Sequence, residues 1–292
     1  MLILSGENCL LIHLNKMKIS VLMSVYKAEK SEYLNRALQS VWDDQTHKPN
    51  EVVLVADGPL TPDLDKIIDK WKEALGASFI LCRNEVNVGL TKSLNKGLKQ
   101  ACGDLIARMD SDDISHPRRF ELQHNFLLDN PDIDVVGGSL QEFNDENECL
   151  NIRHYPQNPK TIKKYICKAS PLAHPTVMMR RRIFDSGLSY DERFRTSQDI
   201  ALWFDVLDKG YNISNVSDIT IYFRLAEDVF KRRSREKAFN EFKIYMNGIY
   251  RLHGLFTFSY IFPISRLIFR LLPQGIIKRI YGSNLRRRVL AK

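Results

Sequence analysis

Residues 104–113 read DLIARMDSDD, an apolar run that ends abruptly in three carboxylates. The run at 104–109 predicts a buried strand, and the alternation of side chains along a strand places Asp110 and Asp112 on one side, about 7 Å apart. Hard divalent cations such as Mg²⁺ and Mn²⁺ bind carboxylate oxygens and accept phosphate oxygens as further ligands. The segment therefore predicts a metal site, although a polar turn in which Asp113 or Ser115 caps a helix that begins near Pro117 explains it as well.

Strands and helices alternate along the chain before this segment. Apolar runs predict strands at 18–25, 51–56 and 79–82, and helical spacing predicts helices at 32–45, 62–75 and 90–101. Because these strands are apolar throughout, the alternation predicts an α/β fold with a mostly parallel sheet covered on both faces. Ligands bind beyond the carboxyl ends of the strands in such sheets. We therefore expect one rim to gather the polar residues that follow three strands: Asp57, residues 87–89 and residues 110–113.

The second half of the chain continues with shorter elements. The patterns predict helices at 118–129, 199–209 and 234–252, and strands at 134–137, 176–179 and 220–224. The first sixteen residues lack a basic start and make a poor signal peptide. Met17 directly precedes the first strand, so it is an alternative start of the natural chain.

Composition is that of a soluble globular protein, with 44% hydrophobic and 27% charged residues. The five cysteines are scattered and form no C-x-x-C pair, which argues against a disulfide framework or a zinc site and favours a reducing compartment. The net charge of +8 comes from residues 229–292, which hold fifteen Lys/Arg against Glu236 and Glu241. Such a segment suits an anionic surface, either membrane or nucleic acid.

Five segments in order carry a family resemblance: ISVLMSVYK (19–27), EVVLVADG (51–58), NVGLTKSLNKGL (87–98), GDLIARMDSDD (103–113) and SQDIALW (197–203). Together they resemble glycosyltransferase family 2, the nucleotide-diphospho-sugar transferases with a GT-A fold. More narrowly they resemble the bacterial enzymes that build O-antigen and exopolysaccharide repeat units. The resemblance implies a catalytic GT-A domain at 18–233 between an N-terminal extension at 1–17 and a C-terminal helical region at 234–292. It also implies an inverting, metal-dependent sugar transfer from a nucleotide diphosphate donor, with UDP favoured, to a saccharide acceptor.

The resemblance assigns one group of residues to the nucleotide pocket: Ser24, Tyr26, Asp57, Asn87, Gly89, Lys92, Asp110 and Arg224. Asp57 would contact the base or the ribose, although Ala56 departs from the family's usual V-D-D-G pattern. Residues 87–89 would close over the nucleoside, whereas a plain turn before a helix is the simpler interpretation. Arg224 and the basic run 231–233 would reach the pyrophosphate, unless they form a solvated basic surface.

The same resemblance assigns the chemistry to three carboxylates. Asp112 would ligate the Mn²⁺ or Mg²⁺ that bridges the diphosphate, and Asp110 would bind the ribose or reach the metal through water. Asp199 would be the catalytic base, since Gln198 stands where the family usually has another acid. A carboxylate at a helix start is kept ionised by the helix dipole. The alternative is that Asp199 is an ordinary first-turn residue.

Two residues are candidates for the acceptor side. His174 precedes a predicted strand and would line the acceptor site, although a structural histidine fits as well. Trp203 lies one helical turn after Asp199 and would offer a sugar-stacking face, whereas a core tryptophan is the alternative.

The C-terminal region combines apolar and basic residues. Residues 255–272 are apolar but are interrupted by Pro263 and by cations, so they are too short to span a bilayer. Arg266 and Arg270 interleave with apolar residues, a pattern typical of helices that lie on an anionic membrane. It suits a polyprenyl-diphosphate-linked acceptor at the cytoplasmic face of a bacterial plasma membrane. A helix that caps the catalytic domain is the alternative.

Other classes of protein fit the sequence less well. A sugar-phosphate nucleotidylyltransferase should have a Gly-rich loop after the first strand, where this chain reads YKAE at 26–29. A dinucleotide-dependent oxidoreductase is excluded because no G-x-G-x-x-G follows a strand. A nucleic-acid protein using the basic tail remains an alternative, but we expect no nucleic-acid partner.

Overall fold

A single nine-stranded sheet organises the part of the chain that this computed structural model describes, residues 17–146, 148–225 and 235–271. Its N-terminal half contains four parallel strands: β1 (Ile19–Val25), β2 (Glu51–Ala56), β3 (Phe79–Arg83) and β4 (Leu105–Met109). These are the strands that the apolar runs predict, and β1, β2 and β4 are almost wholly buried. Burial on both faces explains why their sequences do not alternate between apolar and polar residues.

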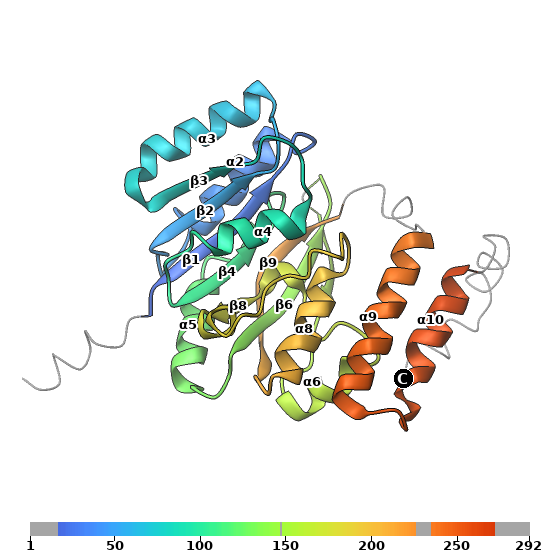
Figure 1. Ribbon diagram of the computed structural model, residues 1–292. Helices are drawn as coiled ribbons and strands as arrows, with labels where there is room; N and C mark the ends of the chain where they lie inside the picture. Colours follow the sequence, from blue (N-terminus) through green and yellow to red (C-terminus); the bar gives the residue numbers. More distant parts are fainter. Residues whose placement is uncertain (1–16, 147, 226–234, 272–292) are drawn as a thin grey trace, which may run out of the picture.

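The second half of the sheet mixes strand directions. It contains β8 (Met178–Arg180), β6 (Val135–Phe143), β9 (Ile213–Arg224), β5 (Ile114–Ser115) and β7 (Cys149–Arg153). The strand order is β3-β2-β1-β4-β8-β6-β9-β5, with β7 paired to β6 beside this path (Figure 1). β8 is antiparallel to both its neighbours, and β9 runs parallel to β6. The predicted α/β fold with a mostly parallel sheet flanked by helices is confirmed, whereas β5 and β7 were not predicted.

Side chains of the strands enter two separate cores, because successive residues of a strand point to opposite faces. Val21 and Met23 of β1 pack with α2 (Ser31–Val41), α3 (Pro62–Leu75) and α5 (Arg119–Asp129). Leu22 packs on the other face with α4 (Leu90–Leu98), α6 (Pro159–Tyr165), α7 (Arg182–Asp185) and α8 (Gln198–Asp208). Two short 3₁₀ turns, η1 (Gly76–Ser78) and η2 (His174–Thr176), precede β3 and β8. Helices therefore cover both faces of the sheet.

A helical hairpin follows the sheet and packs on α8. It consists of α9 (Arg235–His253), the 3₁₀ turn η3 (Phe258–Tyr260) and α10 (Ile261–Leu271). A Cβ on Gly248 would lie 2.3 Å from the Phe204 ring, so glycine permits the close approach of α9 to α8. Figure 1 shows α10 outermost, beyond α9. Among the described residues, none of the helices has the length and hydrophobicity needed to cross a membrane.

Several expected segments lie outside the described residues. They are nearly all of the N-terminal extension at 1–17, the basic run 231–233, and the part of the C-terminal region beyond Leu271.

Candidate active site

The carboxyl ends of three neighbouring strands meet at one rim of the sheet. In the parallel register Val25 at the end of β1 lies opposite Ala56 at the end of β2, and Met23 lies opposite Met109 at the end of β4. Tyr26, Asp57 and Asp110 directly follow these strands, so the register brings three of the predicted site residues to the same edge. Tyr26 is half exposed there, and Ser24 is partly buried.

Asp57 binds the loop that contains Asn87 and Gly89. Its Oδ1 accepts hydrogen bonds from Val88 N at 2.8 Å and Asn84 Nδ2 at 3.0 Å, and its Oδ2 accepts from Gly89 N at 2.9 Å. Asn87 Nδ2 in turn donates to the carbonyl oxygen of Asp57 at 3.2 Å. The carboxylate is buried, so in this structure it positions the 84–89 loop.

Gly58 allows that loop to come close. Its φ of +89° lies in the left-handed region, and an added Cβ would be 2.7 Å from Asn87 N. Only glycine combines this backbone conformation with the missing side chain. The Asp57-Gly58 pair therefore builds the loop geometry at this part of the rim.

Three acids at the end of β4 form a cluster that fits a cation. Asp110, Asp112 and Asp113 each offer a carboxylate oxygen, and these three atoms lie within 4.8 Å of one another. The chain leaves the extended conformation after Met109, so strand alternation no longer separates Asp113 from the other two. The oxygens are also closer together than the strand spacing predicted. The sequence assigned Asp113 to a possible helix cap, and its place in the cluster was missed.

The electrostatics of the cluster are those of crowded, buried acids. Burial raises the pKa of Asp112 to about 6, and the charges of Asp110 and Glu29 add to the rise. Burial and the charges of Asp110 and Asp112 raise the pKa of Asp113 well above its ordinary value. Within the described part of the chain, Asp113 Oδ2 is buried without a hydrogen-bond partner. A buried, unpaired oxygen among like charges is what a divalent cation would satisfy, so the donor set fits Mg²⁺ or Mn²⁺.

Glu29 reaches this cluster from the loop after β1. Its Oε2 accepts a hydrogen bond from Ser111 Oγ at 2.6 Å. No motif in the sequence indicated Glu29, because the contact joins residues 82 positions apart.

Arg108 is the buried cation beside the acids. Its Nη1 donates to Asp110 Oδ2 at 2.6 Å, its Nη2 donates to Asp110 Oδ1, and its side chain is 3% exposed. No motif in the sequence indicated Arg108, although it stands two residues before Asp110. Its charge also opposes the raised pKa values of Asp112 and Asp199.

Asp199 lies in the first turn of α8, partly buried. Ser197 before it has a φ of +62°, the only positive value at a non-glycine residue of the described segments. Burial raises the pKa of Asp199, whereas a backbone hydrogen bond at Ile200 and the charge of Arg108 lower it. The guanidinium that binds Asp110 therefore also lowers the pKa of the predicted base.

Helix α4 joins the 84–89 loop to the segment that leads into α8. Asn95 Nδ2 donates to Tyr190 O at 2.8 Å, and Asn95 Oδ1 accepts from Tyr190 N at 3.0 Å. Thr91 Oγ1 donates to Phe194 O at 2.7 Å. The predicted nucleotide loop and the predicted base are therefore held on one framework, with Lys92 exposed on the same helix.

His174 and Trp203, the acceptor-side candidates, are both buried. His174 Nε2 is hydrogen-bonded to Tyr190 Oη at 2.8 Å, and burial together with the charge of Arg108 holds the pKa of His174 well below its ordinary value. The ring of Trp203 lies edge-on to that of His174, 6.2 Å away, and is 0% exposed. In this structure Trp203 is a core residue and presents no face to a ligand.

Arg224 fixes the acidic turn. Its backbone N donates to Asp113 Oδ1 at 2.9 Å, and its Nε donates to Asp112 O at 3.0 Å. The guanidinium lies 3.8 Å from the Tyr33 ring centroid and donates to Asp145 Oδ1 at 3.0 Å. Arg224, predicted to reach a pyrophosphate, is here occupied with supporting the turn.

Comparison with known proteins identifies the class. The family model "Glycosyl transferase family 2" matches residues 20–188, and the chain belongs to this family of glycosyltransferase enzymes. It is 33% identical to the Escherichia coli UDP-Gal:alpha-D-GlcNAc-diphosphoundecaprenol beta-1,3-galactosyltransferase, over 92% of this chain and 97% of that protein. It is 30% identical to the amylovoran biosynthesis glycosyltransferase AmsE of Erwinia amylovora, over 91% of this chain and 98% of that one.

Solved structures agree on the fold. S. aureus TarS in complex with UDP superposes with a TM-score of 0.61 at 20% identity, covering 92% of this chain and 73% of that one. The mannosyltransferase PcManGT of Pyrobaculum calidifontis, in complex with GDP-Man and Mn²⁺, gives a TM-score of 0.61 at 13% identity and covers 94% and 81%. The predicted GT-A fold is confirmed.

Proposed function

We propose that the protein transfers a sugar, with inversion, from a UDP-sugar to a polyprenyl-diphosphate-linked saccharide during synthesis of a cell-surface polysaccharide. The observation that carries the proposal is the cluster of Asp110, Asp112 and Asp113 at the carboxyl rim of the sheet. The Arg108 that binds Asp110 also lowers the pKa of Asp199. The name of the Escherichia coli relative supports both substrates, since it specifies a UDP-Gal donor and a lipid-diphosphate acceptor.

The three clustered aspartates would hold Mn²⁺ or Mg²⁺. Bound there, the cation would neutralise the negative charge that grows on the diphosphate leaving group. Arg108 keeps Asp110 oriented with both oxygens engaged, and Arg224 keeps the acidic turn in place. These two arginines therefore preorganise the cluster.

Asp199 would act as the general base. It takes the proton of the acceptor hydroxyl while that oxygen bonds to the anomeric carbon from the face opposite the diphosphate. The bond from that carbon to the diphosphate oxygen breaks in the same displacement, and the configuration inverts. Burial supports this role because it moves the pKa of Asp199 upward, toward the pH at which a base works best.

The other predicted residues fit around this reaction. Asp57 holds the 84–89 loop in the position where Asn87, Gly89 and Lys92 would enclose the nucleoside. Ser24 and Tyr26 lie at the carboxyl end of the neighbouring strand β1 and would form the other side of the pocket. His174, held neutral and bonded to Tyr190, would lie on the acceptor side. Trp203 would support His174 from the core rather than stack on a sugar.

A lipid-linked acceptor requires the enzyme at a membrane. We place the protein on the cytoplasmic face of the bacterial plasma membrane, attached peripherally through its C-terminal region. No specific observation favours the nucleic-acid or nucleotidylyltransferase alternatives, so neither is proposed.

The test is a transfer assay with purified full-length protein. A panel of UDP-, dTDP- and GDP-sugars is offered with a synthetic GlcNAc-diphosphate-lipid acceptor, with Mn²⁺ or with EDTA, and the product anomer is determined by NMR. We expect transfer from a UDP-sugar, its loss in EDTA and in Asp112→Ala and Asp199→Ala, and an inverted anomer. Asp129→Ala, an exposed acid at the end of α5, is the matched control.

Each part of the proposal can fail separately. Retention of the anomeric configuration would exclude the single displacement. Full activity in EDTA would exclude the metal, and near-normal turnover of Asp199→Ala would exclude this base. No transfer from any sugar nucleotide to any lipid-linked acceptor would overturn the proposed function itself.

A further inference from the structure

The connection between α9 and α10 exposes large apolar side chains. We call the following four residues the apolar tip: Leu255, Phe256, Phe258 and Ile261. Phe258 is 98% exposed and Phe256 is wholly exposed, which is unusual for phenylalanine in a soluble protein. We propose that the apolar tip inserts into the interface of a lipid bilayer and that this contact is apolar rather than electrostatic.

The tip is held in shape by its own polar groups. Thr257 Oγ1 accepts from Ser259 N at 3.2 Å, and Tyr260 Oη donates to Gly254 O at 2.9 Å. Gly254 N donates to Tyr250 O at 2.8 Å and ends α9. Backbone groups that are already bonded cost less to bring into a lipid interface, so the connection is suited to insertion.

The exposed surface continues along α10. Ile261, Ile264, Ile268 and Leu271 recur at helical spacing, and all four are exposed. An eleven-residue helix is far shorter than the roughly 20 residues needed to span a bilayer. Such an apolar stripe suits a helix that lies in the plane of the interface.

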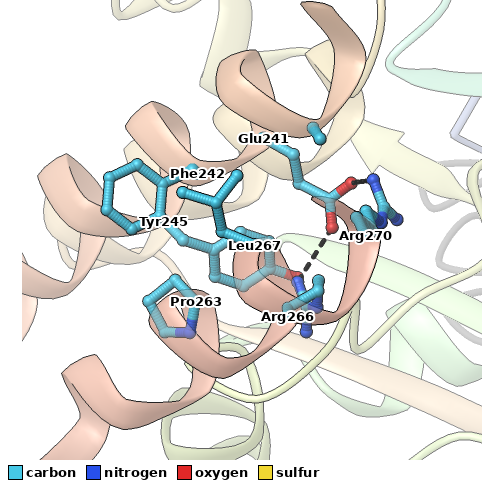
Figure 2. A pocket seen from close by; sticks show the side chains of 8 residues that line it. Glu241, Phe242, Tyr245, Pro263, Arg266, Leu267 and Arg270 are labelled. Atoms are coloured by element: carbon cyan, nitrogen blue, oxygen red, sulfur yellow. Dashed lines mark hydrogen bonds and ion pairs between the residues drawn. The ribbon is translucent and has the colours of Figure 1, made fainter. Parts of the chain in front are cut away.

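The cations of α10 are paired within the hairpin. Arg266 Nη1 donates to Glu241 Oε1 at 2.9 Å, and Arg270 Nη1 donates to Glu241 Oε2 at 2.5 Å. Figure 2 shows both arginines turned toward this glutamate of α9 beside Tyr245, whose ring centroid lies 4.4 Å from the Arg266 guanidinium. The sequence pattern predicts that these two arginines contact an anionic membrane. In the structure both form ion pairs with the buried carboxylate of Glu241 instead. Apolar contacts must therefore supply most of the binding that α10 provides.

A bilayer fits this surface better than a second protein chain. Residues 272–292, which follow α10 in the sequence, contain six Lys/Arg and no acid. An apolar surface followed by cations matches the layering of a membrane, where hydrocarbon lies beneath anionic headgroups. A second copy of the chain would add another such segment of six Lys/Arg and no acid, so the two segments offer each other no opposite charge.

The experiment measures flotation of the full-length protein with vesicles, without donor or acceptor. Vesicles of phosphatidylcholine alone are compared with vesicles that also contain phosphatidylglycerol, in low salt and in about 0.5 M NaCl, where charge interactions are screened. We expect binding to phosphatidylcholine alone that persists in high salt. The double variant Phe256→Ser/Phe258→Ser should lose at least about tenfold in partitioning, because each buried ring contributes on the order of one tenfold step or more.

The control replaces apolar residues that are exposed elsewhere. Leu150→Ser/Ile152→Ser on β7 removes two exposed apolar side chains from the sheet instead of the hairpin and should leave flotation unchanged. The melting temperature of Phe256→Ser/Phe258→Ser should equal that of the parent. A fall of several degrees would mean that the chain's own C-terminal residues cover the tip, and it would overturn the proposal. A parent dimer that dissociates in the double variant would overturn it in favour of a second copy.

The dependence of flotation on salt and on lipid charge distinguishes apolar insertion from electrostatic attachment. Binding only to phosphatidylglycerol vesicles, with release in high salt, would assign attachment to charge and contradict the inference. The inference builds on the proposed lipid-linked acceptor, but the two fail differently. Transfer to a short-chain, water-soluble acceptor should be unchanged in the double variant, whereas absence of any transfer with intact flotation would remove the proposed function alone.

Discussion

Arg108 and Asp110, two residues apart at the end of β4, form a forked ion pair in which both Nη atoms donate to the two carboxylate oxygens. Arg108 belongs to β4 and Asp110 directly follows it, so a single segment delivers a buried cation and a candidate metal ligand to the rim. Arg108 Nε is buried without a hydrogen-bond partner among the described residues, so the two bonds to Asp110 are the side-chain hydrogen bonds that hold the guanidinium. The charge of Arg108 also lowers the pKa of Asp199.

Two replacements of Arg108 should distinguish the effect of its paired hydrogen bonds to Asp110 from the effect of its positive charge on Asp199. Arg108→Lys keeps the charge but cannot form two parallel hydrogen bonds, so we expect kcat to fall at least about tenfold. Arg108→Met removes the cation that lowers the pKa of Asp199, so the acidic limb of the kcat/KM profile should move to higher pH. Arg83→Lys, in a surface pair with Asp65, is the control. A residue with only a structural role would change the melting temperature and leave the pH profile in place.

Asp113→Asn tests the third acid of the cluster. Asparagine keeps an oxygen for the hydrogen bond from Arg224 N but loses the charge, so the fold should remain while Mn²⁺ binding weakens by about tenfold or more. Isothermal titration with Mn²⁺ measures this directly. Unchanged Mn²⁺ affinity in Asp113→Asn, combined with loss of stability in Asp113→Ala, would restrict Asp113 to supporting the turn.

The metal-free protein should lose stability as the pH rises through the pKa of Asp112. The folded pKa of Asp112 is about 6, above the unfolded value of about 3.9, so the folded state holds this proton more tightly. The stabilising contribution is complete below about pH 4 and is lost as the pH rises toward about 6. Melting temperatures in EDTA across this range measure the effect. Asp112→Asn should flatten it, and Mn²⁺ should raise the melting temperature most at the upper end.

Asp57→Asn tests the role of the loop. The amide cannot accept the hydrogen bond from Gly89 N at Oδ2 if its oxygen keeps the bond from Val88 N, so the 84–89 loop should loosen. We expect the KM for the sugar nucleotide to rise several-fold while kcat changes less, with Asp63→Asn on the surface as control. If Asp57 instead contacts the base, the variant should lose discrimination between UDP- and dTDP-sugars and keep its loop stability.

The sequence by itself determined the four parallel strands, the longer helices that flank the sheet, and the rim. The apolar run at 51–56 and the helical pattern at 62–75 coincide with β2 and α3, because continuous burial and amphipathic spacing are local properties. The expectation that Asp57, residues 87–89 and residues 110–113 meet followed from parallel strands sharing one carboxyl edge. β5, with two residues, has no comparable pattern.

Only the tertiary structure decided how these side chains are used. The carboxylate of Asp57 is engaged by backbone N–H groups 31 and 32 residues away, and Glu241 pairs with arginines 25 and 29 residues later. Asp113 joins the cluster because the chain bends after Met109. Such contacts depend on how whole elements pack against one another, and no periodicity within a single element records them.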